Sequence, residues 1–448
     1  KGFTGVPQTP VFLRYTRRYT YQYTYTMLRF PHALGLLHDI KFDTRHALYL
    51  FCLVILFWAL FDATVAYLVP ITITERGISN TLMGVIVGTS SIAGAFFDFL
   101  LCRFLGNTYY KRLFIWMFAV CLFVPFVLFQ AHTFWMFILA MVLWGIYYDF
   151  KGIGIFNFVG RNTSFEKHAE SFGLIQIFLS LGYLIAPLFV GFLVAERFDW
   201  RPFALAWVFI SISIFFFIAL VLLSRQLEDT SQAMKEHGER KQEKFSTEIR
   251  LWRGIGKVLF PVLFFTFLVT VADAYFWTIG PLIAEELVDS LGVFSGAFMV
   301  AYVLPPLLVA FFVGRYTKKF GKKYGAIISF FLGSCLLLLF PFFGTTPWLV
   351  VGVFFASMGI SLSLPAINGA YADYISETEE YEKEIEGLQD FYTNLGFVFG
   401  PMSAGYLSDV VGNLEAFVYL GLFCGIAVVI LTLFMPKSIN VRKQMTKA

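Results

Sequence analysis

Two aspartates occupy matching positions in two apolar segments of the sequence. Asp62 precedes Pro70 at the same spacing as Asp273 precedes Pro281. A carboxylate inside a bilayer costs several kcal/mol unless it is protonated, paired or hydrated. At about 1.5 Å of rise per residue, each lies about 22 to 24 Å from the start of its segment, a little beyond mid-membrane. We expect one or both to gain and lose a proton between two states of the protein. The alternative is that each only accepts hydrogen bonds from a neighbouring helix.

Other polar and aromatic side chains in the apolar segments could line the same space. The candidates for binding are Thr64, Tyr148, Asp149, Tyr275, Trp277, Ser363 and Asn368. Their hydroxyl, amide and aromatic groups suit an uncharged or cationic organic molecule. Asp149 and Lys151 face different sides of one helix, which argues against a direct pair. Asp149 is either a ligand for a cationic or hydroxyl-bearing molecule or a group solvated at the membrane surface. Basic residues are scarce in these segments, which disfavours anions such as sugar phosphates and carboxylates.

A third group of residues could govern how helices move. Small residues let helix backbones approach closely, and a proline bends a helix. We assign this conformational role to Gly182, Pro187, Gly191, Gly396, Gly400, Pro401 and Gly405. Asp98 and Asp390 lie near the ends of their segments on one side of the membrane. Either Asp98 latches a gate against the positive amino-terminal end of the segment near 386, or both acids merely reach the membrane surface.

The elements that carry these residues are long apolar segments. Hydrophobic residues make up 58% of the sequence and charged residues only 14%, whereas soluble domains carry about a quarter charged residues. The segments are continuously apolar, without the alternation of a β-barrel strand, so an all-α membrane protein is predicted. The twelve predicted transmembrane helices are 47–70, 80–104, 113–131, 134–157, 172–195, 203–224, 257–282, 292–314, 324–344, 347–371, 386–408 and 416–435.

The distribution of Lys and Arg predicts the orientation. With the amino terminus inside, all 34 basic residues except Arg76, Arg197 and Arg201 fall on the cytoplasmic side, as the positive-inside rule requires. We therefore expect a multi-pass protein of the plasma membrane with both termini in the cytoplasm. The polar stretches are an amino-terminal extension, 1–46, expected to be disordered at least to residue 26, a cytoplasmic linker, 225–256, and a tail, 437–448.

The two halves of the sequence repeat each other. Gly173, Gly182, Ala186-Pro187 and Gly191 recur at one constant separation as Gly387, Gly396, Gly400-Pro401 and Gly405. Gly84 and Gly296 match in the second and eighth segments. Duplication explains these coincidences far better than generic packing does. The repeat predicts two pseudo-symmetric six-helix bundles, 47–224 and 257–436.

This arrangement resembles the major facilitator superfamily (MFS) over residues 45 to about 436. The stretch from Gly173 to Gly191 resembles the fifth-span signature Gly-x8-Gly-x3-Gly-Pro-x2-Gly-Gly of antiporters in that superfamily, with Ala186 and Val190 replacing two glycines. The stretch from Asp62 to Pro70 resembles the first-span signature of multidrug antiporters, but it is one residue shorter. The loop signature after the eighth span is weaker, because Lys318 replaces its aspartate.

The resemblance implies a secondary transporter whose two bundles rock about a central site lined by spans one, four, seven and ten. We expect proton-coupled efflux of hydrophobic or cationic compounds. The alternatives are a symporter or uniporter for a neutral nutrient such as a sugar or nucleoside and, from another class, a transport-dead receptor or a membrane-embedded enzyme. The sequence carries no nucleotide-binding loop, metal cluster or catalytic triad, so we expect no catalysis, cofactor or metal. The expected partners are a small-molecule substrate, protons and the lipid bilayer, without nucleic acid, and a monomer is favoured.

Overall fold

The computed structural model describes residues 44–104, 109–163, 167–224, 245–309, 312–377 and 381–434, and every regular element in them is a helix. Contacts group residues 42–448 into one compact unit. The first half of the chain forms α1 (Thr44–Glu75), α2 (Asn80–Phe104), α3 (Tyr110–Gln130), α4 (Phe134–Asn162), α5 (His168–Glu196) and α6 (Arg201–Ser224). The second half forms α7 (Phe245–Glu286), α8 (Val288–Leu291), η4 (Gly292–Phe294), α9 (Ala297–Val309), α10 (Val313–Phe320), α11 (Lys322–Leu337), α12 (Phe340–Phe343), α13 (Pro347–Glu377), α14 (Glu382–Val411) and α15 (Asn413–Phe434).

Helix bounds differ from the predicted spans in a few places. α7 begins at Phe245, so the last part of the predicted linker continues into the seventh span. The ninth predicted span divides into α11 and α12, because Pro341 has no amide hydrogen to continue the helix and its ring clashes with the preceding turn. The predicted extension and tail, and linker residues 225–244, lie outside the described residues.

Within the described residues, nine helices are long and apolar enough to cross a membrane, or ten if the bent pair Val288–Phe294 and Ala297–Val309 is one span. The axes of that pair meet at 61°. The two remaining predicted spans correspond to α11, which is short, and to α14, whose first turns carry the charged sequence EKEIEGLQD. These charges lower its mean hydropathy, although its 30 residues are enough to span a bilayer.

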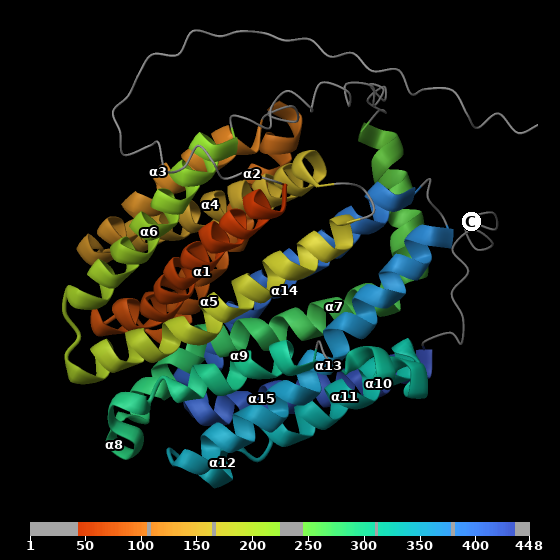
Figure 1. The fold of residues 1–448 in the computed structure, drawn as a ribbon. Coiled ribbons are helices and arrows are strands. Elements are labelled where there is room, and N and C mark those ends of the chain that lie inside the picture. Colours follow the sequence, from red (N-terminus) through yellow and green to blue (C-terminus); the bar gives the residue numbers. More distant parts are fainter. Residues whose placement is uncertain are drawn as a thin grey trace, which may run out of the picture. The chain divides into compact units, whose positions relative to one another are not determined.

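The helices group by sequence half, as the internal repeat predicts (Figure 1). In the first bundle α1 packs against α5 and α6, α4 against α2 and α3, and α3 against α6. In the second bundle α7 packs against α14 and α15, α13 against α9 and α11, and α11 against α15. The bundles meet where α2 packs against α14, α5 against α9, and α1 against α7.

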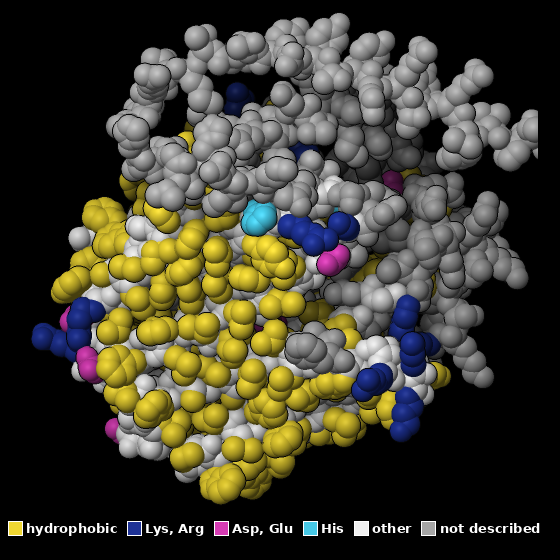
Figure 2. All heavy atoms as spheres, viewed as in Figure 1, with side chains coloured by type: hydrophobic (Ala, Val, Ile, Leu, Met, Phe, Trp, Pro, Cys, Tyr) yellow, Lys and Arg dark blue, Asp and Glu magenta, His cyan; other side chains and the backbone are white. Residues whose placement is uncertain are grey.

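The outer surface of the helices is apolar. Figure 2 shows one face covered by hydrophobic side chains, with charged side chains gathered toward its edges. Large side chains such as Trp135, Phe342 and Leu433 are 76%, 86% and 78% exposed. A soluble protein rarely exposes so much contiguous apolar surface, whereas a bilayer covers it without cost.

Candidate functional site

Asp62 lies in the middle of α1 and is only 2% exposed. Its Oδ1 accepts hydrogen bonds from Trp144 Nε1 at 2.9 Å and from the Tyr147 hydroxyl at 2.5 Å, both on α4. Its Oδ2 accepts a hydrogen bond from the Tyr183 hydroxyl on α5. Three donors from two neighbouring helices therefore satisfy this buried carboxylate. The hydrogen-bonding role expected as the alternative is realised here, while proton exchange stays a prediction.

Lys151 is a buried cation close to this carboxylate that the sequence reasoning did not single out. It is 6% exposed, and its Nζ lies 3.7 Å from the ring centroid of Tyr148 and 4.8 Å from that of Trp58. Contacts of this kind stabilise a cation by about 0.5 to 2 kcal/mol each. The signal was present, because Lys151 falls inside the predicted span 134–157, but the sequence did not reveal which rings surround it.

Asp273 occupies the corresponding place in the second bundle and is partly exposed. It accepts a hydrogen bond from the Tyr302 hydroxyl on α9, and Trp277, one turn further along α7, lies close enough to interact with it. The Trp277 ring packs edge-on against Tyr183, with centroids 5.7 Å apart. A continuous path of contacts therefore runs from Asp62 through Tyr183 and Trp277 to Asp273, across the boundary between the bundles.

Three of the expected binding residues make contacts inside the helix bundles. Thr64 and Ser363 are fully buried, and each hydroxyl donates to a carbonyl of its own helix, at 2.7 Å and 2.5 Å respectively. Tyr275 is 3% exposed and packs edge-on against Phe417 inside the second bundle. All three are engaged within helix packing, so they offer no group to a solute in this conformation.

The other expected binding residues separate into two groups. Tyr148 is 45% exposed and lies beside Lys151, and Trp277 belongs to the path between the aspartates. The Asp149 carboxylate instead packs over Gly94 of α2. Asn368 is exposed and accepts a hydrogen bond from Gln389 Nε2 at 3.3 Å. Only Tyr148 and Trp277 therefore join the two aspartates.

Three of the small residues assigned a conformational role pack inside their own bundles. Gly182 lies against α1, and Gly396 and Gly400 lie against α7. A methyl group added at any of them would come within 2.5 to 2.6 Å of a side-chain carbon, which is closer than atoms tolerate. These glycines therefore set the spacing between neighbouring helices of one bundle.

The remaining small residues form two equivalent backbone contacts between the bundles. In each contact, a glycine near the start of one helix lies so close to a proline carbonyl and a glycine of the facing helix that no side chain fits between them. The contacts join Gly84 of α2 to Pro401 and Gly405 of α14, and Gly296, just before α9, to Pro187 and Gly191 of α5. Positions that match in the sequence repeat thus make matching contacts.

A polar cluster, which we name the Asp409 latch, reinforces one of these contacts. The Asp409 carboxylate at the end of α14 accepts hydrogen bonds from the backbone amides of Asn80 and Thr81 at 3.0 and 2.7 Å, and from the Thr81 hydroxyl at 2.6 Å. Asn80 Nδ2 donates to Ser408 Oγ at 2.8 Å. An acid at the amino terminus of a helix is stabilised by its dipole. The repeat places Ala195 at the equivalent position of the first half, so the latch belongs to one contact only.

Asp409 lies just beyond the predicted span 386–408. Desolvation by burial opposes its ionisation, yet the hydrogen bonds from Thr81 and Asn80 hold its pKa below the ordinary value. The carboxylate is therefore charged at neutral pH. Sequence reasoning missed it, because an acid at a helix end is common and its partner lies far away in the chain.

The structure describes no contact between the two acids expected to form a gate, Asp98 and Asp390. The side chain of Asp98 lies outside the described residues. Asp390 is exposed. Their proposed gating role stays a prediction.

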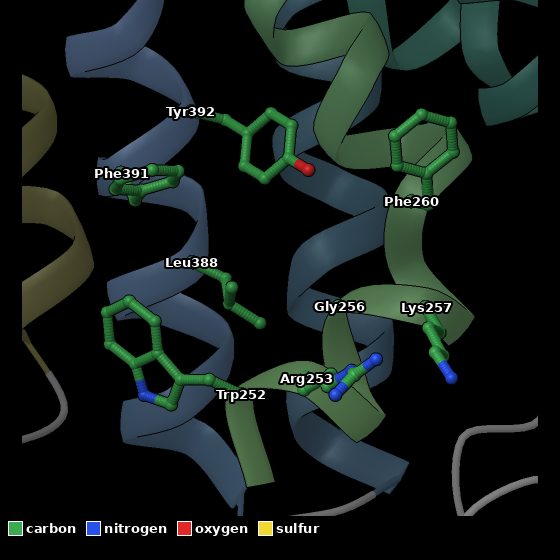
Figure 3. A pocket seen from close by; sticks show the side chains of 8 residues that line it. All are labelled: Trp252, Arg253, Gly256, Lys257, Phe260, Leu388, Phe391 and Tyr392. Atoms are coloured by element: carbon green, nitrogen blue, oxygen red, sulfur yellow. The ribbon is translucent and has the colours of Figure 1, made fainter. Parts of the chain in front are cut away.

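A separate cavity of about 520 Å³ lies between the amino-terminal halves of α7 and of α14. Figure 3 shows Trp252 and Leu388 on one side of it and Arg253 and Lys257 on the other. Phe260, which also lines it, is about 20 Å along α7 from Asp273 at 1.5 Å of rise per residue. The cavity is therefore distinct from the aspartate site.

Comparison with known proteins agrees with this architecture. The profile of the Major Facilitator Superfamily matches residues 50–286 and 262–446. No curated protein matches the sequence. The structure of the nucleoside transporter NupG is similar in fold, with a TM-score of 0.69 at 13% identity, covering 87% of this chain and 99% of that one.

Two further structures are similar in fold. A bacterial homolog of the human lysosomal transporter Spinster, in an inward-facing conformation, has a TM-score of 0.65 at 13% identity and covers 91% of this chain and 98% of that one. A POT family transporter in complex with 5-aminolevulinic acid has a TM-score of 0.65 at 14% identity, covering 87% and 96%. At these identities the likeness concerns the fold alone. The profile match spans both helical bundles, and the chain therefore belongs to the Major Facilitator Superfamily of membrane transporters.

Proposed function

We propose that this protein moves a small organic solute across the membrane by alternating access, coupled to protons through Asp62 and Asp273. The observation that carries the proposal is the path of contacts from one aspartate to the other through Tyr183 and Trp277. Each bundle contributes one intramembrane acid, and the two acids lie on either side of the bundle boundary. Intramembrane acids of this kind mark ion pathways by default.

The hydrogen bonds suggest how proton uptake is linked to bundle movement. The oxygens of Asp62 accept three hydrogen bonds, which oppose the effect of burial, because burial disfavours the ionised form. Tyr183 donates to Asp62 and also touches Trp277 of the second bundle. When the bundles move apart at this level, the Tyr183–Trp277 contact breaks and the hydroxyl of Tyr183 is free to reorient. Losing one donor shifts the balance toward protonated Asp62.

The aromatic side chains around the aspartates support an organic solute with an apolar part. Tyr148 and Trp277 supply flat surfaces of this kind. A cationic solute, expected from the sequence, is disfavoured beside the buried Lys151. The fifth-span signature favours export, while the neutral nutrient expected as the alternative would need import. The transport assay measures the direction.

The test uses the purified chain in proteoliposomes. A panel of solutes is screened by thermal stabilisation, and those that bind are assayed for accumulation driven by an imposed pH gradient. The Asp62→Asn and Asp273→Asn variants should each lose the gradient-driven component. Asp289→Asn, which changes an exposed acid of α8, is the matched control and should keep it. Undiminished gradient-driven transport in both membrane variants refutes the proposal.

We also propose that both termini face the cytoplasm of a cell whose plasma membrane holds the protein as a monomer. In this orientation Arg76, Arg197 and Arg201 are the only Lys or Arg residues of the sequence outside the cytoplasmic side, which supports it. Single cysteines at Arg76 and Arg197, in a background without the native cysteines, should react with an impermeant maleimide added to intact cells. A cysteine at Lys257 should react only after the cells are opened. The reverse labelling pattern contradicts the orientation.

A further inference from the structure

Lys151 carries hydrogen-bond donors that nothing in the described part of the chain accepts. It is 6% exposed, yet its ammonium forms no hydrogen bond or ion pair with any described residue, and its contacts are the rings of Trp58 and Tyr148. An ammonium has three N–H donors and no acceptor. Ring faces attract the charge but do not replace acceptors, so the N–H donors of this ammonium are left to water or to a solute.

Asp62 does not fill this role in the present conformation. Its carboxylate is near enough to attract Lys151 electrostatically, but the two form no ion pair within 4.0 Å among the described residues. The Asp62 oxygens are already occupied by Trp144, Tyr147 and Tyr183. Among the described residues, the cluster therefore holds a carboxylate with three hydrogen-bond donors and an ammonium that meets no acceptor.

The two rings around the ammonium differ in how firmly they are held. Trp58 is fully buried in the first bundle, whereas Tyr148 is 45% exposed. Tyr148 also lies close enough to Tyr183 to interact with it electrostatically, and Tyr183 touches Trp277 across the bundle boundary. Tyr148 therefore covers Lys151 on the side of the transport site, and a turn of this one side chain would open the ammonium to a solute.

We propose that Lys151 binds an anionic group of the transported solute, a carboxylate or a phosphate, with Tyr148 as its movable cover. This inference rests on the proposed transport function and names its substrate class. It replaces the expectation that anions are disfavoured, which took basic residues to be too scarce in the spans. One buried ammonium is enough to offset one substrate charge at low dielectric.

Charge balance links this binding to the proton. The other titratable groups facing Asp62 and Lys151 are Cys121, Tyr147, Tyr148 and Tyr183, thiol and phenol groups whose ordinary forms at physiological pH carry no charge. With Asp62 ionised, the cluster has no net charge, and with Asp62 protonated it carries the single positive charge of Lys151. An anionic solute therefore binds best together with a proton. The pair would cross in the same direction, as in symport, which replaces the proton-driven export that the fifth-span signature favours.

The experiment measures binding to the full chain in detergent by thermal shift. The library contains carboxylates with their amides, phosphates with their alcohols, and organic cations, for example nicotinate with nicotinamide and uridine monophosphate with uridine. We expect at least one anion to stabilise the wild type while its uncharged partner does not. The carboxylate and phosphate arms then identify the group that binds.

Variants assign the binding to Lys151. Lys151→Gln should weaken the Kd of that anion about 10- to 150-fold, the loss of a charge-assisted hydrogen bond, whereas Lys151→Arg should retain most of it. Lys257→Gln, which changes an exposed lysine of α7, is the matched control. Retention of binding in Lys151→Gln, or stabilisation by neutral or cationic members only or by no member, overturns the inference.

The same solute separates this inference from the proposed function. If a neutral solute is bound and moved by a pH gradient in wild type and in Lys151→Gln alike, transport stands and the anion site falls. If an anion binds through Lys151 but is never moved in proteoliposomes, the site stands and the transport proposal falls. Size-exclusion profiles of the ligand-free variants establish that each one is folded.

Discussion

Gly296→Ala should shift the protein away from the conformation described above. The added methyl would overlap the Pro187 carbonyl and would also approach the α-carbon of Gly191 to 3.5 Å. Because both obstacles are backbone atoms, they cannot move aside as a flexible side chain would. The backbones of α5 and of the segment before α9 must therefore separate wherever this contact is formed.

The size of the effect follows from overpacking. Forcing one methyl into a close-packed contact costs about 1 to 3 kcal/mol, and this cost applies only to the conformation in which the bundles touch here. A difference of that size changes the ratio of the two conformations about 5- to 150-fold. Gly84→Ala at the equivalent contact should have a similar effect, because its methyl would overlap the Pro401 carbonyl.

The assay is electron–electron resonance between spin labels on cysteines at Arg197 and Asp289, two exposed positions near the ends of α5 and α8, with the native cysteines removed. Gly296→Ala should increase the population at longer distance. Gly160→Ala is the matched control, since a methyl on that helical glycine meets nothing within 4 Å. An unchanged distance distribution in Gly296→Ala, or an equal change in Gly160→Ala, refutes the reasoning.

Three further predictions concern single side chains. Asp409→Asn should weaken the contact between α2 and α14, while Gly296 still holds the equivalent contact between α5 and α9. We expect a longer distance between spin labels placed at Ser79 and Val410. Hydrogen bonds hold the pKa of Asp409 below its ordinary value. The distance between these labels in the wild type should therefore stay constant from neutral to mildly acidic pH and lengthen only when the pH falls through that lowered pKa. A longer distance already at mildly acidic pH contradicts this prediction. Tyr302→Phe removes the hydroxyl that donates to Asp273 but keeps the ring stacked on Phe276, whose ring centroid is 4.0 Å away. Gradient-driven transport should therefore change, while the expression level and the size-exclusion profile do not. Unchanged transport opposes a role for that hydrogen bond.

Much of the fold follows from patterns along the sequence. Continuous apolar runs predict helices that a bilayer surrounds, and the repeat of Gly84 in Gly296 and of Pro187 in Pro401 predicts that equivalent positions share an environment. The contacts confirm that environment for these two pairs, since Gly84 and Gly296 each lie against a proline carbonyl of the facing helix, although the recurring Gly173 and Gly387 meet no backbone atom of another helix. The division between α11 and α12 could also have been read from Pro341.

The site was harder to predict, because its chemistry depends on contacts between distant segments. Asp62 and Asp273 stand out as acids in apolar surroundings. The donors that surround them, among them Tyr183 and Tyr302, look like ordinary aromatic residues until the helices are packed. The hydroxyl of Thr64 shows the opposite difficulty, because a hydroxyl inside a helix readily bonds to a carbonyl of its own backbone, which the sequence does not reveal.

The measurement that tests the central claim most directly follows protons themselves. Proteoliposomes containing a pH-sensitive dye are given a gradient of a solute that binds the protein, and the internal pH is recorded for wild type and for Asp62→Asn/Asp273→Asn. Wild type should move protons as the solute moves, while the double variant should exchange labelled for unlabelled solute without any pH change. Proton movement of equal size in the double variant would contradict the claim that these two aspartates carry the proton.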